Sequence, residues 1–389
     1  MGKFAVRTYD AISPVGLRRF SADYAVAPDT EQPDAIMLRS FSLHNEAINE
    51  SVLAIGRAGA GVNNIPVQDM TERGVVVFNA PGANANSVKE LVVAGMLLAA
   101  RNLPGALAYA KGLPEQDMKK AVERGKKQFA GAELSGSTLG VIGLGAIGYR
   151  VANVAVSLGM RVLGYDPAIS EQHAADLSPQ VHRVHSLDHL LSESDYLTLH
   201  VPLADTTRNL LDAEKIAQLR PGSVVLNFAR DELIDEAALL AALDSGAVGG
   251  YVTDFPNPAV YAHDKVIVLP HLGASTSSAE DNCAIMIADQ LQDYLENGNI
   301  RHSVNFPAVS LPRRGFLRLT LAHKNTPGVI AEFAKLISGA GINVVEMIND
   351  CRGEYAYSIM EIEADALPES VAAELARMPQ VLRLRIITD

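Results

Sequence analysis

The chain has 389 residues, of which 48% are hydrophobic and 20% charged, so two or three domains are expected rather than one core. Its formal net charge of -12 disfavours nucleic acid as a partner, although a local basic pocket can still bind a small anion. Two cysteines fit neither a disulfide framework nor a zinc site, so we expect a reducing compartment and no metal. An apolar signal core and a membrane-spanning run are both lacking, which predicts a soluble cytoplasmic protein with no membrane partner.

The first hundred residues predict a parallel α/β sheet. Apolar runs at 35–40, 52–59 and 74–81 have the length of buried strands, and helical stretches alternate with them. Residues 104–136 are polar and rich in lysine, and they predict a helical connector.

A second α/β series begins at residue 137. The strands predicted for it have the sequences TLGVIG, RVLGYD, YLTLHVP, SVVLNFA, GGYVTDF and VIVLP. A helical pattern from about residue 279 predicts a long helix that crosses back to the first unit.

The last part of the chain predicts a small separate unit. Residues 304–315 contain irregular breaks and indicate a linker. The strands and helices that follow have the order βαββαβ, which is a ferredoxin-like pattern. The predicted fold class is therefore α/β, with two doubly wound parallel-sheet domains of the Rossmann or flavodoxin type and a C-terminal ferredoxin-like domain. The predicted domains are 1–95 with 280–305, 96–279, a linker at 306–316, and 317–389.

A glycine-rich loop predicts a dinucleotide site. Gly143, Gly145 and Gly148 follow a strand and open a helix, where they permit a tight turn, a close approach to a pyrophosphate and close helix packing. Asp166 ends the next strand about 20 residues later, where a carboxylate accepts hydrogen bonds from ribose hydroxyls and repels a 2′-phosphate. The motif therefore predicts NAD as the cofactor.

Three polar residues at the ends of later strands predict hydride-transfer chemistry. Arg230 suits a substrate carboxylate, because a guanidinium binds one with two parallel hydrogen bonds. His271 suits proton transfer, because the pKa of imidazole lies near working pH. Asp254, between them in sequence, is placed to accept from the nicotinamide carboxamide.

These motifs resemble those of the D-isomer-specific 2-hydroxyacid dehydrogenases. The resemblance rests on NFARDELID, TDF and LPHLGAST, and on GRAGAGVNNI and NAPGANANSVKEL nearer the N-terminus. It implies a substrate-binding domain built from both chain ends around an inserted NAD domain. SVNFPAVSLP, HKNTPGV and the βαββαβ order resemble the linker and ACT domain of family members that oxidise D-3-phosphoglycerate to 3-phosphohydroxypyruvate, the first step of L-serine biosynthesis.

The resemblance also implies residue roles. Arg230 would bind the substrate carboxylate and polarise the carbonyl, and His271 would be the acid/base. The residues implied to contact NAD are Gly143, Gly145, Ala146, Ile147, Gly148, Asp166, Phe228, Ala229, Arg230, Asp254 and His271. The residues implied to contact substrate are Arg39 and Ser40 at the phosphate, Asn84 or Asn86 near the carboxylate, and Arg230. The residues implied to bind L-serine as an effector are His323, Asn325 and Asn343.

The sequence departs from the family at one catalytic position. The family continues from the aspartate of TDF to a Glu-Pro pair whose glutamate orients the catalytic histidine. Here the loop is shorter and Asn257 stands at that place, so we expect its amide to accept from His271 without supplying charge. Asp235 and Asp264 are alternative carboxylates, and Lys265 or His263 are alternative participants in proton transfer.

Several alternatives remain open from the sequence. In place of oxidation of D-3-phosphoglycerate, one alternative is another D-2-hydroxyacid dehydrogenase or hydroxypyruvate reductase. The other is an NAD-dependent sensor with little turnover. The basic cluster at Arg124, Lys126 and Lys127 has two interpretations. It would add positive charge to the phosphate site of the partner in a homo-dimer, or it is an ordinary solvated helix face. Relatives imply a homo-dimer or tetramer.

Overall fold

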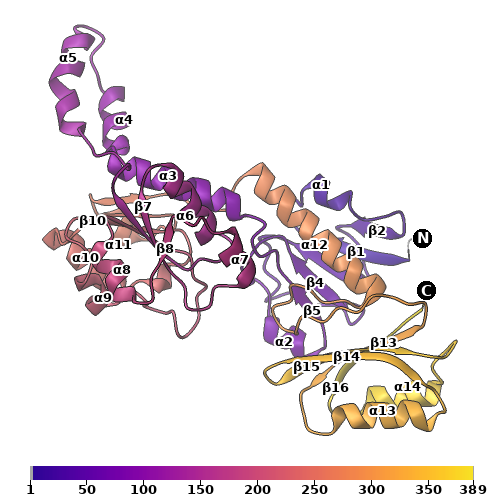
Figure 1. The fold of residues 1–389 in the computed structure, drawn as a ribbon. Helices are drawn as coiled ribbons and strands as arrows, with labels where there is room; N and C mark the ends of the chain where they lie inside the picture. Colours follow the sequence, from indigo (N-terminus) through magenta and orange to yellow (C-terminus); the bar gives the residue numbers. More distant parts are fainter. Residues whose placement is uncertain (1–2, 389) are drawn as a thin grey trace. The chain divides into compact units, whose positions relative to one another are not determined.

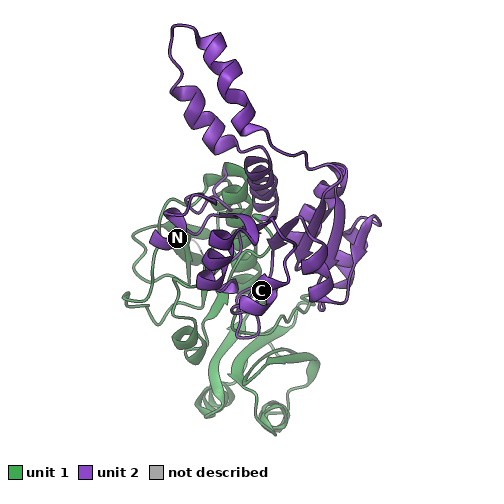
Figure 2. Cartoon of the chain, turned by 90° about the vertical axis from the view of Figure 1, so that its left-hand side faces the viewer, with its two compact units in different colours: residues 1–84, 277–389 green, residues 85–276 purple. Residues whose placement is uncertain are grey.

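A computed structural model describes residues 3–388 of the chain. Contacts divide the chain into two compact units, Met1–Asn84 with Ser277–Asp389 as unit 1 and Ala85–Thr276 as unit 2 (Figure 2). The chain therefore leaves unit 1 and later returns to it. The domain boundaries expected from the sequence, at 95/96, 279/280 and the linker, stay predictions.

Unit 1 contains a five-stranded parallel sheet in the order β2-β1-β3-β4-β5. Its strands are β1 (Phe4–Thr8), β2 (Tyr24–Ala27), β3 (Ala35–Leu38), β4 (Ala54–Arg57) and β5 (Val76–Phe78). Its helices are α1 (Pro14–Leu17), α2 (Val67–Glu72) and the long α12 (Ser277–Asn297). Strands β3 and β5 are buried throughout, which explains their uninterrupted apolar sequences.

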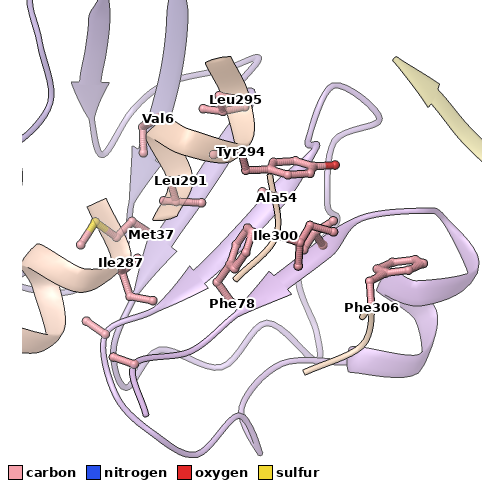
Figure 3. Packing of buried hydrophobic residues seen from close by; sticks show 14 of the residues in the cluster. Val6, Met37, Ala54, Phe78, Ile287, Leu291, Tyr294, Leu295, Ile300 and Phe306 are labelled. Atoms are coloured by element: carbon pink, nitrogen blue, oxygen red, sulfur yellow. The ribbon is translucent and has the colours of Figure 1, made fainter. Parts of the chain in front are cut away.

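Helix α12 joins the two ends of the chain in one core. Its apolar face packs on the sheet through Ile287, Leu291 and Tyr294, which share a buried cluster with Met37 and Phe78 (Figure 3). The predicted long helix after residue 279 is therefore present, and it completes unit 1.

The C-terminal part of unit 1 forms a four-stranded antiparallel sheet in the order β14-β15-β13-β16. Its elements in chain order are β13 (Leu317–Lys324), α13 (Val329–Gly339), β14 (Val344–Arg352), β15 (Tyr355–Ile362), α14 (Glu369–Arg377) and β16 (Val381–Ile387) (Figure 1). This is the predicted βαββαβ pattern, and its helices cover one face of the sheet through a cluster that includes Leu319, Phe333 and Leu375.

The other face of this sheet is docked on the rest of unit 1. Tyr357 is buried in the same cluster as Tyr294, and its hydroxyl donates to the Gly298 carbonyl at 2.8 Å. Arg385 donates to the carbonyls of Tyr294 and Leu295, each at 2.8 Å, and lies over the Tyr294 ring. These donors bind carbonyls at the C-terminal end of α12, and the Tyr294 carbonyl also accepts the N–H of Gly298 at 2.8 Å. The two arginine contacts complement the negative end of the helix dipole.

Unit 2 is built on a seven-stranded parallel sheet in the order β12-β11-β10-β9-β6-β7-β8. Its strands are β6 (Thr138–Ile142), β7 (Arg161–Tyr165), β8 (Val181–Arg183), β9 (Tyr196–Leu199), β10 (Ser223–Asn227), β11 (Val248–Thr253) and β12 (Val266–Val268). The strand order reverses between β6 and β9, which is where ligands bind in open α/β sheets. The predicted α/β fold class, with two parallel sheets and an antiparallel C-terminal sheet, is confirmed.

The helices of unit 2 cover its sheet, except for an arm. They are α3 (Ala85–Ala100), α4 (Leu103–Lys111), α5 (Met118–Gly125), α6 (Gly148–Ser157), α7 (Glu171–Asp176), α8 (Leu187–Glu193), α9 (Ala213–Ala217), α10 (Glu236–Ser245) and α11 (Pro258–Tyr261), with the short 3-10 turns η1 (Lys126–Phe129) and η2 (Asp231–Leu233). Helices α4 and α5 stand away from the sheet and have no buried residue (Figure 1). Over residues 3–388 no single helix has the length and apolarity to cross a membrane; the bent pair α3–α4 meets that test by length and composition only.

Candidate active site

The glycine-rich loop follows β6 at the reversal of strand order. Gly143 has a φ of 87°, and a Cβ there would lie 2.7 Å from the carbonyl oxygen of His200, so only glycine fits. A Cβ on Gly148 would lie 1.8 Å from the Gly143 carbonyl oxygen, so the start of α6 packs directly on the turn. A Cβ on Gly145 would meet nothing within 4 Å, so the middle of the loop is open to a ligand.

Asp166 is fixed beside this loop. Its Oδ2 accepts the backbone N–H of Leu144 at 2.8 Å, and its Oδ1 accepts that of Ala168 at 2.9 Å. Ala146 and Ile147 form the turn into α6. The structure thus brings the predicted acidic residue and the predicted loop together, in the arrangement that suits a ribose diol and a pyrophosphate.

The strand end that carries Arg230 is shaped by a buried asparagine. The Asn227 side chain donates to the carbonyl of Arg230 at 2.7 Å and accepts from the N–H of Ala229 at 3.1 Å. This clamp holds the turn after β10, with Phe228 buried beneath it and Arg230 exposed. The Arg230 guanidinium donates to the Ala229 carbonyl at 2.6 Å.

Asp254 and His271 are neighbours in space. Asp254 follows β11 and is only 1% exposed, and its Oδ2 accepts from the N–H of Gly273 at 2.8 Å. The N–H of His271 donates to the Asp254 carbonyl at 3.0 Å. His271 has a φ of 50°, in the left-handed region, and its ring packs edge-on against Phe255 with centroids 5.2 Å apart.

The Asp254 carboxylate is incompletely satisfied. Burial raises its pKa, while the Gly273 N–H and the nearby His271 ring lower it. Its Oδ1 is buried and has no hydrogen-bond partner, which is rare for a buried oxygen. A donor supplied by a ligand, such as a carboxamide NH2, would satisfy this atom. The open loop, Asp166 and this orphaned oxygen therefore fit NAD.

Asn257 has structural partners. Its Oδ1 caps α11 by accepting from the N–H groups of Ala259 and Val260, each at 3.0 Å. Its Nδ2 donates to Glu236 at 2.5 Å. An amide oxygen has two lone pairs, and both are used here, so none is left to accept from His271 in this structure. The expected role of Asn257 as an acceptor for His271 stays a prediction, and these contacts do not support it.

Three of the other candidates, Lys265, His263 and Asp235, have partners elsewhere. Lys265 donates from Nζ to the Leu243 carbonyl at 2.5 Å, and the His263 ring lies 3.2 Å from Asp244. Asp235 caps α10 by accepting from the N–H of Ala238 at 3.1 Å. Burial raises the pKa of Asp254 and is the larger effect, while the His271 ring lowers it.

Unit 1 carries a second group of predicted residues, where β3 and β4 end. Asp10 accepts from the backbone N–H groups of Ser40 and Phe41 at 2.8 and 2.7 Å, and so shapes the turn that holds Arg39 and Ser40. Arg57, at the end of β4, donates from Nε to the Arg39 carbonyl at 3.0 Å. Two arginines therefore come together beside an exposed serine, which suits an anionic group.

Asn84 and Asn86 lie in different units. Asn84 ends the first segment of unit 1, whereas Asn86 lies in the first turn of α3 in unit 2. The Asn86 amide donates to Glu90 at 2.8 Å and accepts from Lys89 at 2.6 Å, and it lines an open surface depression between α3 and α6.

The three residues expected to bind serine have different surroundings. His323 is only 1% exposed, and its ring contacts the Lys324 carbonyl at 2.9 Å and Ser358 at 2.9 Å. Burial lowers its pKa. Asn325 and Asn343 are exposed, and each donates one hydrogen bond of 3.3 Å, to the Gly353 carbonyl and to Glu363.

Comparisons with known proteins show the family of the chain. Residues 94–273 match the D-isomer specific 2-hydroxyacid dehydrogenase, NAD binding domain. The chain is 35% identical over 370 residues to the D-3-phosphoglycerate dehydrogenase of Escherichia coli K12, which covers 90% of this chain and 86% of that protein. The chain belongs to the D-isomer-specific 2-hydroxyacid dehydrogenase family.

Two further relatives define the extent of the match. The chain is 35% identical to the D-3-phosphoglycerate dehydrogenase of Synechocystis, over 91% of this chain but only 61% of that longer protein. The structure of NAD+-bound 3-phosphoglycerate dehydrogenase from Entamoeba histolytica aligns with a TM-score of 0.59 and 25% identity, covering 78% of this chain and 98% of that one. The chain is accordingly an NAD-dependent oxidoreductase of this dehydrogenase family.

Three residues of this dehydrogenase were missed by reading the sequence. Asn227 was read only as part of a strand, although a buried asparagine directly before a candidate arginine is a usable signal. Arg57 ends the strand after the one that leads to Arg39, and adjacent parallel strands end at the same edge of a sheet. Glu280, which pairs with Arg39, lies 241 positions later in sequence, and no local pattern connects them.

Proposed function

We propose that this chain oxidises D-3-phosphoglycerate to 3-phosphohydroxypyruvate with NAD, the first step of L-serine biosynthesis. The observation that carries the proposal is the pair Arg39–Ser40 beside Arg57, a phosphate-compatible group in a chain whose relatives over nine-tenths of its length are D-3-phosphoglycerate dehydrogenases. The small anionic substrate thus meets local positive charge on a protein of net charge -12.

In this mechanism the chain holds the substrate at both ends and removes one proton. Arg230 binds the carboxylate and polarises the adjacent C–O bond, and Arg39 with Ser40 binds the phosphate. His271 accepts the C2 hydroxyl proton through its imidazole. Asp254 orients the nicotinamide through its unpaired oxygen. When bound, NAD supplies the acceptor for the hydride that leaves C2.

A substrate panel tests the proposal. We expect kcat/KM for D-3-phosphoglycerate to exceed that for D-glycerate and D-lactate by about a hundredfold, because two charge-assisted hydrogen bonds contribute about 3 kcal/mol. The Arg39→Gln variant should lose most of this preference. Equal efficiency on D-glycerate would indicate another D-2-hydroxyacid dehydrogenase, and NAD binding without turnover of any substrate would indicate the sensor.

We also propose that the arm of α4 and α5 mediates a homo-dimer. Leu107 is 59% exposed and Met118 is 46% exposed, on an arm whose two helices have no buried residue, and a partner that covers these two side chains would remove them from water. A second copy of this chain would do so symmetrically. Sedimentation of the Leu107→Glu variant should show monomers; an unchanged dimer would contradict this use of the arm.

L-Serine is proposed as an effector of the C-terminal unit. Exposed Asn325 and Asn343 offer amides that both donate and accept, as an amino acid requires. Binding by His323 additionally requires its buried ring to exchange the contacts with Lys324 and Ser358. Titration calorimetry should show saturable serine binding that is weakened by Asn325→Ala; no heat at millimolar serine would refute it.

A further inference from the structure

The guanidinium of Arg39 already has an anionic partner within unit 1. Its Nη1 lies 2.6 Å from Oε1 of Glu280, and the two side chains are 28% and 41% exposed. The pair is therefore partly shielded from water, which strengthens it relative to a fully exposed pair. A carboxylate occupies the position where an anionic substrate group would bind.

Both partners are held by fixed backbone. The Arg39 carbonyl accepts from Arg57 at 3.0 Å and from the Asn64 side chain at 3.2 Å. Glu280 lies in the first turn of α12, whose next residue, Asp281, contacts Ser13. Rotation of either side chain breaks the pair and leaves these backbone contacts in place.

We propose that Glu280 is an internal competitor for the substrate phosphate, an inference that rests on the proposed function of Arg39. A guanidinium fork binds one planar or tetrahedral anion at a time with its best geometry. A phosphate dianion displaces the carboxylate monoanion, whereas weaker anions leave the pair closed. Glu280 therefore raises the KM for the phosphorylated substrate and keeps adventitious anions off Arg39.

The Glu280→Gln variant tests this competition, because glutamine keeps the shape and removes the charge. The KM for D-3-phosphoglycerate should fall about two- to fivefold, the range for a partly exposed ion pair. The inhibition constant of inorganic phosphate against D-3-phosphoglycerate should fall by the same factor. The kcat and the KM for NAD should not change, because the phosphate contact is the same in the ground state and the transition state.

Asp289→Asn is the matched control. It removes one negative charge from the same helix and breaks a comparable pair, in which Arg19 lies 2.8 Å from Asp289. This variant should leave the KM and the phosphate inhibition constant unchanged. Equal decreases in the two variants would reduce the effect to net charge and would overturn the inference.

The Arg39→Gln variant separates this inference from the proposed function. In its background, Glu280→Gln should have no further effect, because the competed group is gone. If Arg39→Gln raises the KM while Glu280→Gln leaves it unchanged or raises it, the phosphate site stands and the competition is refuted. If Arg39→Gln leaves the KM for D-3-phosphoglycerate unchanged, the phosphate role of Arg39 itself fails.

Discussion

Substitution of Asn257 separates a structural role from a catalytic one. Asn257→Ala removes the cap of α11, which is worth about 1 kcal/mol for an asparagine at this position. It also removes the donor to Glu236, a hydrogen bond to a charged group that contributes about 1 kcal/mol where water has partial access. We therefore expect a loss of about 2 kcal/mol in the free energy of unfolding.

Two further substitutions divide this loss between its sources. Asn257→Ser keeps a capping oxygen and loses the donor, so about half of the loss should remain. Asn257→Asp keeps the cap but faces the Glu236 carboxylate with a second one, so it should be as destabilising as alanine. Adding Glu236→Gln to Asn257→Asp should restore most of the stability, because the amide donor then lies on the other side of the contact.

Urea unfolding and the pH profile of kcat/KM, measured on the same variants, decide the question. If the contacts in the structure define the role of Asn257, the serine variant keeps the wild-type pH profile and kcat once it is folded. A serine variant of nearly wild-type stability with a tenfold lower kcat/KM, or a displaced basic limb, would refute this reasoning. It would then support the sequence-based expectation that the amide acts on His271.

Two other predictions concern a histidine whose protonation is disfavoured in the folded chain and a buried ion pair. Burial lowers the pKa of His200 from 6.5 to about 3. Because the unfolded chain takes up this proton below about pH 6.5 and the folded chain does not, lowering the pH from about 7 to 5 should remove about 2 kcal/mol of stability. The His200→Gln variant should lack that part of the pH dependence, and parallel curves would contradict the assignment. Arg318 and Glu361 form a fully buried pair at 2.7 Å in the C-terminal sheet. Arg318→Met should cost about 3–5 kcal/mol by leaving a buried carboxylate unpaired, and Arg318→Met with Glu361→Leu should recover most of it in urea unfolding; equal losses in both would show that the charge is not the cause.

The cofactor half of the site was predictable because its chemistry is local. The loop residues Gly143 to Gly148 act through backbone geometry, and the spacing to Asp166 follows from one strand–helix–strand unit. Arg230, Asp254 and His271 each follow a strand of one parallel sheet, and such strand ends share an edge. Sequence periodicity therefore carries most of the information about them.

The contacts that sequence could not give are those set by loop length and by docking. The shortened loop after Asp254 turns Asn257 toward α10, and nothing in PNPAV shows whether its amide meets Glu236 or His271. The sequence also did not show which face of the C-terminal sheet is docked on the rest of unit 1. Arg385 alternates with apolar residues, which is the pattern of a strand with one solvent-exposed face, yet its side chain binds the C-terminal end of α12. Long-range partners of this kind leave no periodic signal.

The acidic composition of the chain affects its candidate site, because a substrate anion would have to replace a protein carboxylate as the partner of a basic side chain. In a protein of net charge -12, a cation at a partly buried site is rarely without an acid, and Arg39 has Glu280. Arg230 instead donates to the neutral carbonyl of Ala229, so binding a carboxylate there displaces no ion pair. Under the roles proposed for Arg230 and Arg39, the two ends of the substrate would therefore bind at different free-energy cost. The phosphate end would have to outcompete a built-in anion, so affinity for phosphate would be adjustable at Glu280 without touching the residues proposed to perform the oxidation.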